Sequence, residues 1–255
     1  MKITLLGTGT STGVPRIGND WGECDPAEPR NRRSRCSAVI ESEEGKRILI
    51  DTSTDLRMQL LDRQIDSVDA VLWTHDHADH CHGIDDLRPM RYGRSNPLPG
   101  FGSAETVRRL RGRFGYVFAG KDGYSTIVDL AQLNQLHLVA GCSIRHCEMP
   151  HGSMTSTGML FECGDKSIGY AVDFHEITDD MLQLFDGVQL LVSDCLRRQN
   201  HPTHASLDMA LDFAGAVRAK QVVLTHMDNT MDYAKLTAEL PEHVLVGYDG
   251  LEIAV

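Results

Sequence analysis

The sequence lacks the segments that send a chain into a membrane or out of the cell. No run of residues approaches the ~20 consecutive apolar residues of a membrane-spanning helix. The N-terminal apolar run is interrupted at Gly7, Gly9 and Gly13, which is too early for a secretion signal with ~7–15 apolar residues. We therefore expect no membrane partner and a cytoplasmic location, with residues 2–6 forming the first strand.

Paired cysteines and positive charge are also scarce. The seven Cys are an odd number without a Cys-x-x-Cys pair, which is typical of free thiols in a reducing compartment. Asp and Glu number 36 against 25 Lys and Arg, giving a formal net charge of -11. Such a surface disfavours a protein that wraps a nucleic-acid polymer, although it is compatible with one local basic pocket.

What is present is a regular alternation of short apolar runs and helical patterns. No repeat or linker divides the 255 residues, so we expect one domain over residues 1–255. Helices are predicted at 103–112, 178–185 and, most clearly, 205–218, where apolar residues recur on one face. Strands are predicted at residues 2–6, 37–41, 47–50, 69–73, 143–148, 157–162, 167–172, 188–193, 220–225 and 243–246. This order predicts an α/β or α+β protein with two sheets covered by helices.

Two stretches interrupt that alternation. Residues 8–35 and 86–103 are rich in Gly, Pro and Arg. Both are predicted to be long loops, and loops of that length are often functional.

A dense group of potential metal ligands follows the predicted strand at residues 69–73. It has the pattern His-x-His-x-Asp-His and comprises His75, His77, Asp79 and His80. In an extended segment His75 and His77 project to one side and could hold one ion. A turn after them would direct Asp79 and His80 towards a second ion. Imidazole and carboxylate suit Zn²⁺, Mn²⁺ or Fe²⁺.

Three further candidates end other predicted strands, namely His151, Asp173 and His226. A strand end is a rigid place from which to hold a metal. His146 competes with His151, but it lies within its predicted strand, whereas a Pro-His-Gly turn exposes His151.

In these residues and in their order, the chain resembles the metallo-β-lactamase-fold hydrolases. The resemblance implies an αββα sandwich of two mixed sheets flanked by helices, with a dinuclear site at one edge. It implies two divalent ions, Mn²⁺ or Zn²⁺, between which the sequence offers no choice. It divides the ligands between them: His75, His77 and His151 at the first metal, Asp79, His80 and His226 at the second, and Asp173 as the bridge.

The glycine-rich opening at residues 6–15 and the ending at residues 247–253 resemble the phosphodiesterase branch of that superfamily. This branch includes PhnP-like cyclic phosphodiesterases and the tRNA 3′-processing nuclease RNase Z. There a histidine upstream of the last metal ligand assists phosphate-ester cleavage. His204 matches it by position, and His201 is the alternative. Homodimers are common in this branch.

The expected function is therefore hydrolysis of a small phosphodiester, cyclic or linear, such as a phosphoribosyl cyclic phosphate or a nucleotide. The expected mechanism is attack of metal-bound hydroxide on phosphorus, with His204 as general acid and Asp79 orienting the nucleophile. The alternatives are tRNA 3′-end processing, a thioester or lactone hydrolase of the same fold, and a non-catalytic binding module. No insertion of the kind that forms a basic tRNA-gripping arm is visible in the sequence.

Residues outside the predicted ligand set are also assigned roles. Arginines of the two long loops could bind a second phosphate of the substrate, or they could be solvated and paired with acidic residues; the candidates are Arg32, Arg33, Arg35, Arg88 and Arg91. Asp51 follows a predicted strand and is expected to orient a metal-binding histidine. Cys24 is the single Cys of its loop, where PhnP-like proteins often carry several that hold a structural zinc.

Overall fold

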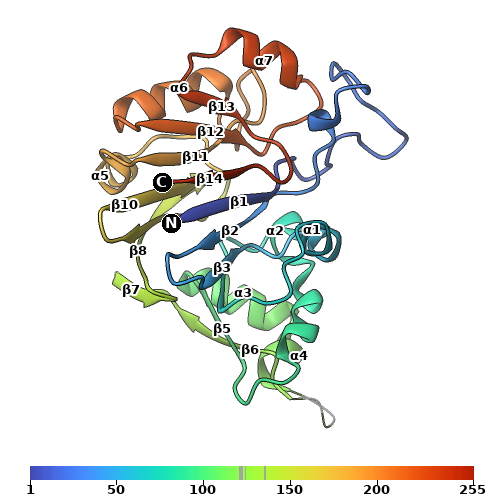
Figure 1. Cartoon of the computed structure of the whole chain (residues 1–255), viewed down its shortest axis with the longest axis vertical. Helices are drawn as coiled ribbons and strands as arrows, with labels where there is room; N and C mark the ends of the chain where they lie inside the picture. Colours follow the sequence, from blue (N-terminus) through green and yellow to red (C-terminus); the bar gives the residue numbers. More distant parts are fainter. Residues whose placement is uncertain (121–122, 124, 135) are drawn as a thin grey trace.

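Two β-sheets form the centre of the computed structural model, which describes residues 1–120, 123, 125–134 and 136–255 (Figure 1). In the described chain each sheet has seven strands. The first, in spatial order, is β14 (Glu252–Ala254), β1 (Lys2–Gly7), β2 (Ser37–Glu41), β3 (Arg47–Ile50), β4 (Ala70–Leu72), β5 (Leu98–Gly102) and β6 (Val128–Gln132). The second is β13 (Val244–Val246), β12 (Gln221–Thr225), β11 (Leu190–Asp194), β10 (Lys166–Ala171), β9 (Met154–Cys163), β8 (Cys142–His151) and β7 (Leu136–Val139).

Both sheets are mixed. In the first, β3 to β6 are parallel to one another, while β14, β1, β2 and β3 pair antiparallel. In the second, β10 to β13 are parallel and β7 to β10 pair antiparallel. The inner faces meet in one apolar cluster that joins residues such as Ile40 and Ile48 of the first sheet to Phe161 and Val192 of the second.

Helices cover the two outer faces. On the first sheet lie α1 (Leu56–Asp62), α3 (Ala104–Arg113) and α4 (Gly115–Ala119), and on the second lie α5 (Asp179–Phe185), α6 (Leu207–Ala216) and α7 (Tyr233–Glu239) (Figure 1). Short helical segments occur at α2 (Ala78–Cys81), η1 (Pro29–Asn31) and η2 (Ile84–Arg91). The predicted two-sheet sandwich is confirmed. Within the described residues, no helix combines the length and apolar character needed to cross a bilayer.

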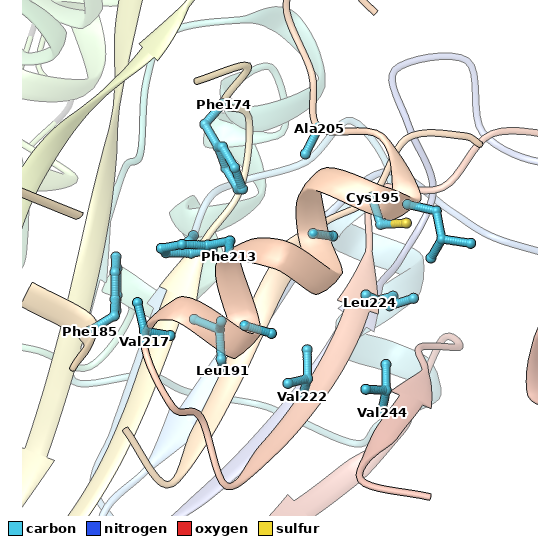
Figure 2. Packing of buried hydrophobic residues seen from close by; sticks show 14 of the residues in the cluster. Phe174, Phe185, Leu191, Cys195, Ala205, Phe213, Val217, Val222, Leu224 and Val244 are labelled. Carbon is cyan, nitrogen blue, oxygen red and sulfur yellow. The ribbon is translucent and has the colours of Figure 1, made fainter. Parts of the chain in front are cut away.

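The apolar packing between α6 and the second sheet also holds the segments that carry candidate site residues. Phe213 of α6 meets the rings of Phe174 and Phe185 edge-on, at centroid distances of 5.4 and 5.8 Å. In Figure 2 the same cluster contains Cys195 and Ala205. Phe174 and Cys195 of this cluster directly follow Asp173 and Asp194, and Ala205 directly follows His204. Packing of these apolar side chains therefore fixes the backbone beside each polar residue.

Most predicted strands and helices are observed, within a few residues of the predicted limits. Thr178 caps α5 by accepting a hydrogen bond from the Met181 N–H. The loop predicted at residues 86–103 is wrong in part, since it contains the end of η2 and all of β5. The sequence of β5, with Pro99, Gly100 and Gly102, resembles a turn. Strands β6, β7 and β14 were not predicted either.

Gly100 explains why a strand has a turn-like composition here. A Cβ at this position would lie 2.9 Å from the ring of Trp73 and even closer to Val128. The bulky Trp73 is fully buried, so the strand can pass it only where a side chain is missing.

Residues 8–35 form the predicted long loop and extend beyond the ends of the sheets (Figure 1). Part of the loop returns to the core. Gly9 forms isolated bridges with Arg35 on one side and with Met227 on the other. The loop is thereby held against the strand ends.

Candidate metal centre

Polar side chains gather where strands of both sheets end. His75, His77, Asp79 and His80 follow β4. From the second sheet, His151 ends β8, Asp173 follows β10 and His226 follows β12. All seven ligands proposed from the sequence therefore lie in one region.

The backbone turns sharply at three of these strand ends. Asp51, Asp173 and His226 have φ values of 60°, 66° and 62°, in the left-handed region. This conformation costs roughly 1–2 kcal/mol for a residue with a Cβ. Such strain is common where a side chain must be aimed at a functional site.

The first group of ligand atoms comes from both sheets. His151 Nε2 lies 3.1 Å from His77 Nδ1, and His75 Nε2 lies 3.2 Å from Asp173 Oδ2. One ligand atom from each of these four residues lies within 4.8 Å of all the others. The group matches the first predicted metal site together with the predicted bridge.

The second group consists of Asp79, His80 and His226. Asp79 Oδ2 lies 3.4 Å from His80 Nε2 and 3.5 Å from His226 Nε2. Asp173 reaches this group as well, with Oδ2 3.4 Å from His80 Nε2 and Oδ1 3.3 Å from His226 Nε2. Asp173 thus lies between the two groups, in a position suited to a bridging ligand.

Buried polar atoms without a hydrogen-bond partner indicate whether these groups suit metal ions. The Nε2 atoms of His75, His80 and His226 and Oδ1 of Asp173 are buried and have no hydrogen-bond partner among the described residues. Buried polar atoms are rarely left unpaired in proteins. Imidazole nitrogens and carboxylate oxygens are ligands that Zn²⁺ and Mn²⁺ accept. The donor set therefore fits divalent cations.

The Nδ1 atoms of two candidate ligands form hydrogen bonds on the side of the ring away from Nε2. His80 Nδ1 donates to Asp51 Oδ2 at 2.7 Å, and His151 Nδ1 donates to the Thr203 carbonyl at 2.7 Å. Such contacts fix the tautomer that leaves the Nε2 lone pair free for a metal. The contact of Asp51 agrees with its predicted role.

The buried charges favour a cation at this place. Although burial alone would raise the pKa of Asp173, His226 and His80 hold it well below its usual range. Burial alone would lower the pKa of His80, but Asp79, Asp173 and Asp51 raise it well above its usual value. The carboxylates therefore create a negative field that a bound cation would compensate.

A cavity of about 310 Å³ opens onto these groups. That volume is at the small end of the range for ligand pockets. Its lining residues are Ser11, His77, Asp79, His151, Gly152, Ser153, Met154, Asp173, Thr203, His204 and His226. His204 is among them and His201 is not, so the geometry favours His204 for contact with a bound molecule.

The sequence analysis missed Asp194, which ends β11 and is fully buried. Its Oδ2 lies 3.3 Å from His204 Nδ1, and its Oδ1 lies 3.5 Å from His226 Nδ1. Oδ2 also accepts a hydrogen bond from the Ala205 N–H. A signal was available, because β11 lies between the two parallel strands that Asp173 and His226 follow.

It also missed the arginines that hold the ligand loop. Asp76 stands between His75 and His77, and Arg113 of α3 contacts both its carbonyl and, at 2.9 Å, its Oδ2. Arg109 of the same helix approaches Asp76 Oδ1 at 3.5 Å. Helix α3 thereby fixes the backbone between two candidate ligands.

The arginines predicted to bind substrate do not line this cavity in the described structure. Arg32 and Arg33 line a second cavity, and Arg88 lines a third. Arg33 is only 1% exposed, and its guanidinium donates to the Met231 carbonyl at 2.7 Å. It ties the long loop to residues 228–231, which the sequence could not reveal because these segments are almost 200 residues apart.

Known proteins with a related sequence or fold match most of this chain. A family model described as the β-lactamase superfamily domain matches residues 46–227. A solved diphosphatase from the PhnP family is 32% identical with a TM-score of 0.90, and the match covers 100% of this chain and 97% of that one. Zn²⁺-bound PqqB from Methylobacterium extorquens is 19% identical with a TM-score of 0.80 over 100% of both chains, which shows a shared fold.

One curated relative is longer than this chain. The octanoyltransferase of Porphyromonas gingivalis is 34% identical over 264 residues, covering 100% of this chain. The chain spans 52% of that protein, about half of its length.

Proposed function

Because the chain belongs to the metallo-β-lactamase superfamily of hydrolases, we propose that it hydrolyses a small phosphodiester at a centre of two divalent metal ions. One observation carries this proposal. Asp173 lies between two groups of candidate ligand atoms beside a small cavity, and a further histidine, His204, lines the same cavity. A thioester hydrolase of this fold would also need the metal ions. Its thiolate leaving group does not need a histidine to protonate it, whereas the alkoxide that leaves a phosphodiester does.

The proposed metal ligands are those assigned from the sequence, with Asp173 shared between the two ions. Bound Mn²⁺ or Zn²⁺ would polarise the phosphate and supply a nucleophile at neutral pH. Asp79 directs Oδ2 towards His80 and His226. Its other oxygen is then available to orient the attacking water.

His204 is proposed to protonate the leaving oxygen. Its Nδ1 faces the carboxylates of Asp194 and Asp173 at 3.3 and 3.5 Å. This leaves Nε2 as the nitrogen that donates the proton to the departing alkoxide. The ring of His204 stacks on that of His226 at 4.9 Å, which restricts its orientation.

A substrate panel tests the proposal. Metal-loaded protein is incubated with bis(p-nitrophenyl) phosphate, with linear and cyclic nucleotide diesters, with a phosphomonoester and with a glutathione thioester. We expect turnover of diesters, weaker turnover of the monoester and none of the thioester. Asp173→Ala should lose bound metal and activity together, whereas Asp180→Ala, an exposed acid of α5, should retain both. Absence of turnover for every phosphodiester would refute the proposal.

A second candidate is hydrolysis of a diphosphate. It is favoured by the likeness to the diphosphatase of the PhnP family, at 32% identity over nearly the whole length of both chains. Both reactions break a P–O bond, so the same ligand set serves either. A disubstituted diphosphate added to the panel separates them, because kcat/KM is then compared on one enzyme preparation. Cleavage of precursor tRNA is the less favoured alternative, given the net charge of -11.

A further inference from the structure

A second cavity, of about 340 Å³, lies on the other side of the glycine-rich segment from the metal centre. Ser11 lines the metal cavity, whereas Gly13 and Val14 line this one. It is enclosed by the long loop, helix α1 and the turn before β14. Its lining residues are Leu6, Gly13, Val14, Pro15, Arg32, Arg33, Ser34, Arg35, Asp55, Met58, Gln59, Asp62, Arg63, Asp249 and Gly250.

Two guanidinium groups of this cavity stand out because no acidic side chain of the described residues forms an ion pair with them. In the described part of the chain, the side chains of Arg32 and Arg63 form no hydrogen bond and no ion pair. The Arg32 guanidinium lies over the ring of Trp21, 5.1 Å from its centroid. Arg63 lies against Gly250, where a Cβ would be 2.7 Å from its Cζ. Several other exposed arginines of this acidic protein are paired with acids, as Arg198 is with Glu239 and Arg218 with Asp186.

A third arginine and the nearby acids complete the charge balance. Arg35 donates through Nε to Thr54 Oγ1 at 2.6 Å and pairs with Asp55 at 3.1 Å, so Asp55 is already neutralised. Asp249 accepts four hydrogen bonds from Thr8 and Ser34. Asp62 is the remaining acid at the cavity. The guanidinium groups of Arg32 and Arg63 therefore leave a local excess of positive charge.

We propose that this cavity binds a phosphomonoester, with its phosphate between Arg32 and Arg63. Guanidinium groups pair with phosphate oxygens through two parallel hydrogen bonds, and each contact is stronger than a neutral one. The volume of the cavity fits a small organic phosphate. Val14, Pro15 and Met58 provide an apolar wall for its organic part.

Backbone hydrogen bonds connect the wall of this cavity to the candidate metal centre. Thr10 donates its N–H to the carbonyl of Met227, which follows the ligand His226, at 3.2 Å. Thr10 also accepts the Gly13 N–H at 2.8 Å. A phosphate held beside Gly13 would therefore act on the segment that borders both cavities.

Binding measurements on the metal-loaded protein test this site without requiring turnover. The probes are adenosine 5′-monophosphate, inorganic phosphate and adenosine, titrated by calorimetry. We expect the two phosphates to bind and adenosine not to bind. The double variant Arg32→Gln, Arg63→Gln should weaken phosphate binding by roughly 10- to 100-fold. The matched double variant Arg108→Gln, Arg218→Gln removes the same charge elsewhere and should bind as the wild type does.

Thermal unfolding of each variant without ligand shows that it is folded. Equal binding by the wild type and the Arg32, Arg63 variant would overturn the proposal, because the phosphate would then belong to the metal centre. Absence of binding by both phosphates would overturn it too. Failure of the substrate panel leaves these outcomes unaffected.

Discussion

At the scale of single residues, proton transfer in the proposed reaction depends on one of two neighbouring histidines. His204 lines the metal cavity, whereas His201 is hydrogen-bonded to Thr203. We expect His204→Ala to keep its metal content and lose activity by about 10²–10⁴-fold, the usual contribution of a general acid. His201→Ala is the matched control and should stay close to wild type. Full activity of His204→Ala, measured with bis(p-nitrophenyl) phosphate, would move the acid role elsewhere.

Asp249 gives a pH dependence of stability. Burial raises the pKa of this carboxyl to about 6, although Ser34 and Thr8 donate hydrogen bonds to it. Between its unfolded value of 3.8 and its folded value, the folded chain binds more protons than the unfolded chain. Its contribution to the free energy of unfolding is therefore full at low pH and is lost as the pH rises through 6.

The measurement compares urea unfolding of the wild type with that of Asp249→Asn, which cannot titrate. We expect the difference in unfolding free energy between the two proteins to shift by about 2 kcal/mol between roughly pH 4.5 and pH 7, against the wild type at the higher pH. Other titrating groups cancel in this difference. A difference that stays constant with pH would contradict the prediction.

At the scale of elements, helix α3 holds the loop of the candidate metal centre without contributing a candidate ligand. Arg113 reaches from its last turn to Asp76, between His75 and His77. Arg113→Met should weaken metal affinity by about 10–100-fold, as loss of outer contacts to ligands commonly does. Arg111→Met is the control on the same turn, since Arg111 binds the Leu130 carbonyl instead. Chelator competition measures both, and equal affinities would show that α3 is dispensable for the site.

The strand ends explain how much could be predicted from the sequence. The motif from His75 to His80 is local, and the strands before Asp173 and His226 are visible as apolar runs, so these residues could be placed at one edge. Asp194 was missed because its place depends on the spatial order of the strands, in which β11 lies between β10 and β12. Arg33, Arg113 and β5 were misjudged or missed because their roles depend on contacts between distant segments, such as Trp73 against Gly100.

At the scale of the whole molecule, the candidate ligands come from both layers of the sandwich. His75, His77, Asp79 and His80 follow a strand of the first sheet, whereas His151, Asp173 and His226 lie at the ends of strands of the second. Metals bound here would connect the layers and stabilise the folded state. A site filled at about 1,000 times its Kd contributes ~4 kcal/mol, so chelation should lower Tm by about 10 °C. Adding Mn²⁺ or Zn²⁺ back should restore Tm. An unchanged Tm in protein verified as metal-free would contradict this expectation.

The left-handed backbone at Asp51, Asp173 and His226 has a consequence for evolution and engineering. Glycine would adopt these φ values without steric cost, so selection for folding alone would place glycine at each of them. A carboxylate or an imidazole stands there instead, and each costs roughly 1–2 kcal/mol in backbone energy. Thermostable variants selected without an activity screen should therefore accumulate changes at these three positions. The protein gives up stability there in exchange for chemistry.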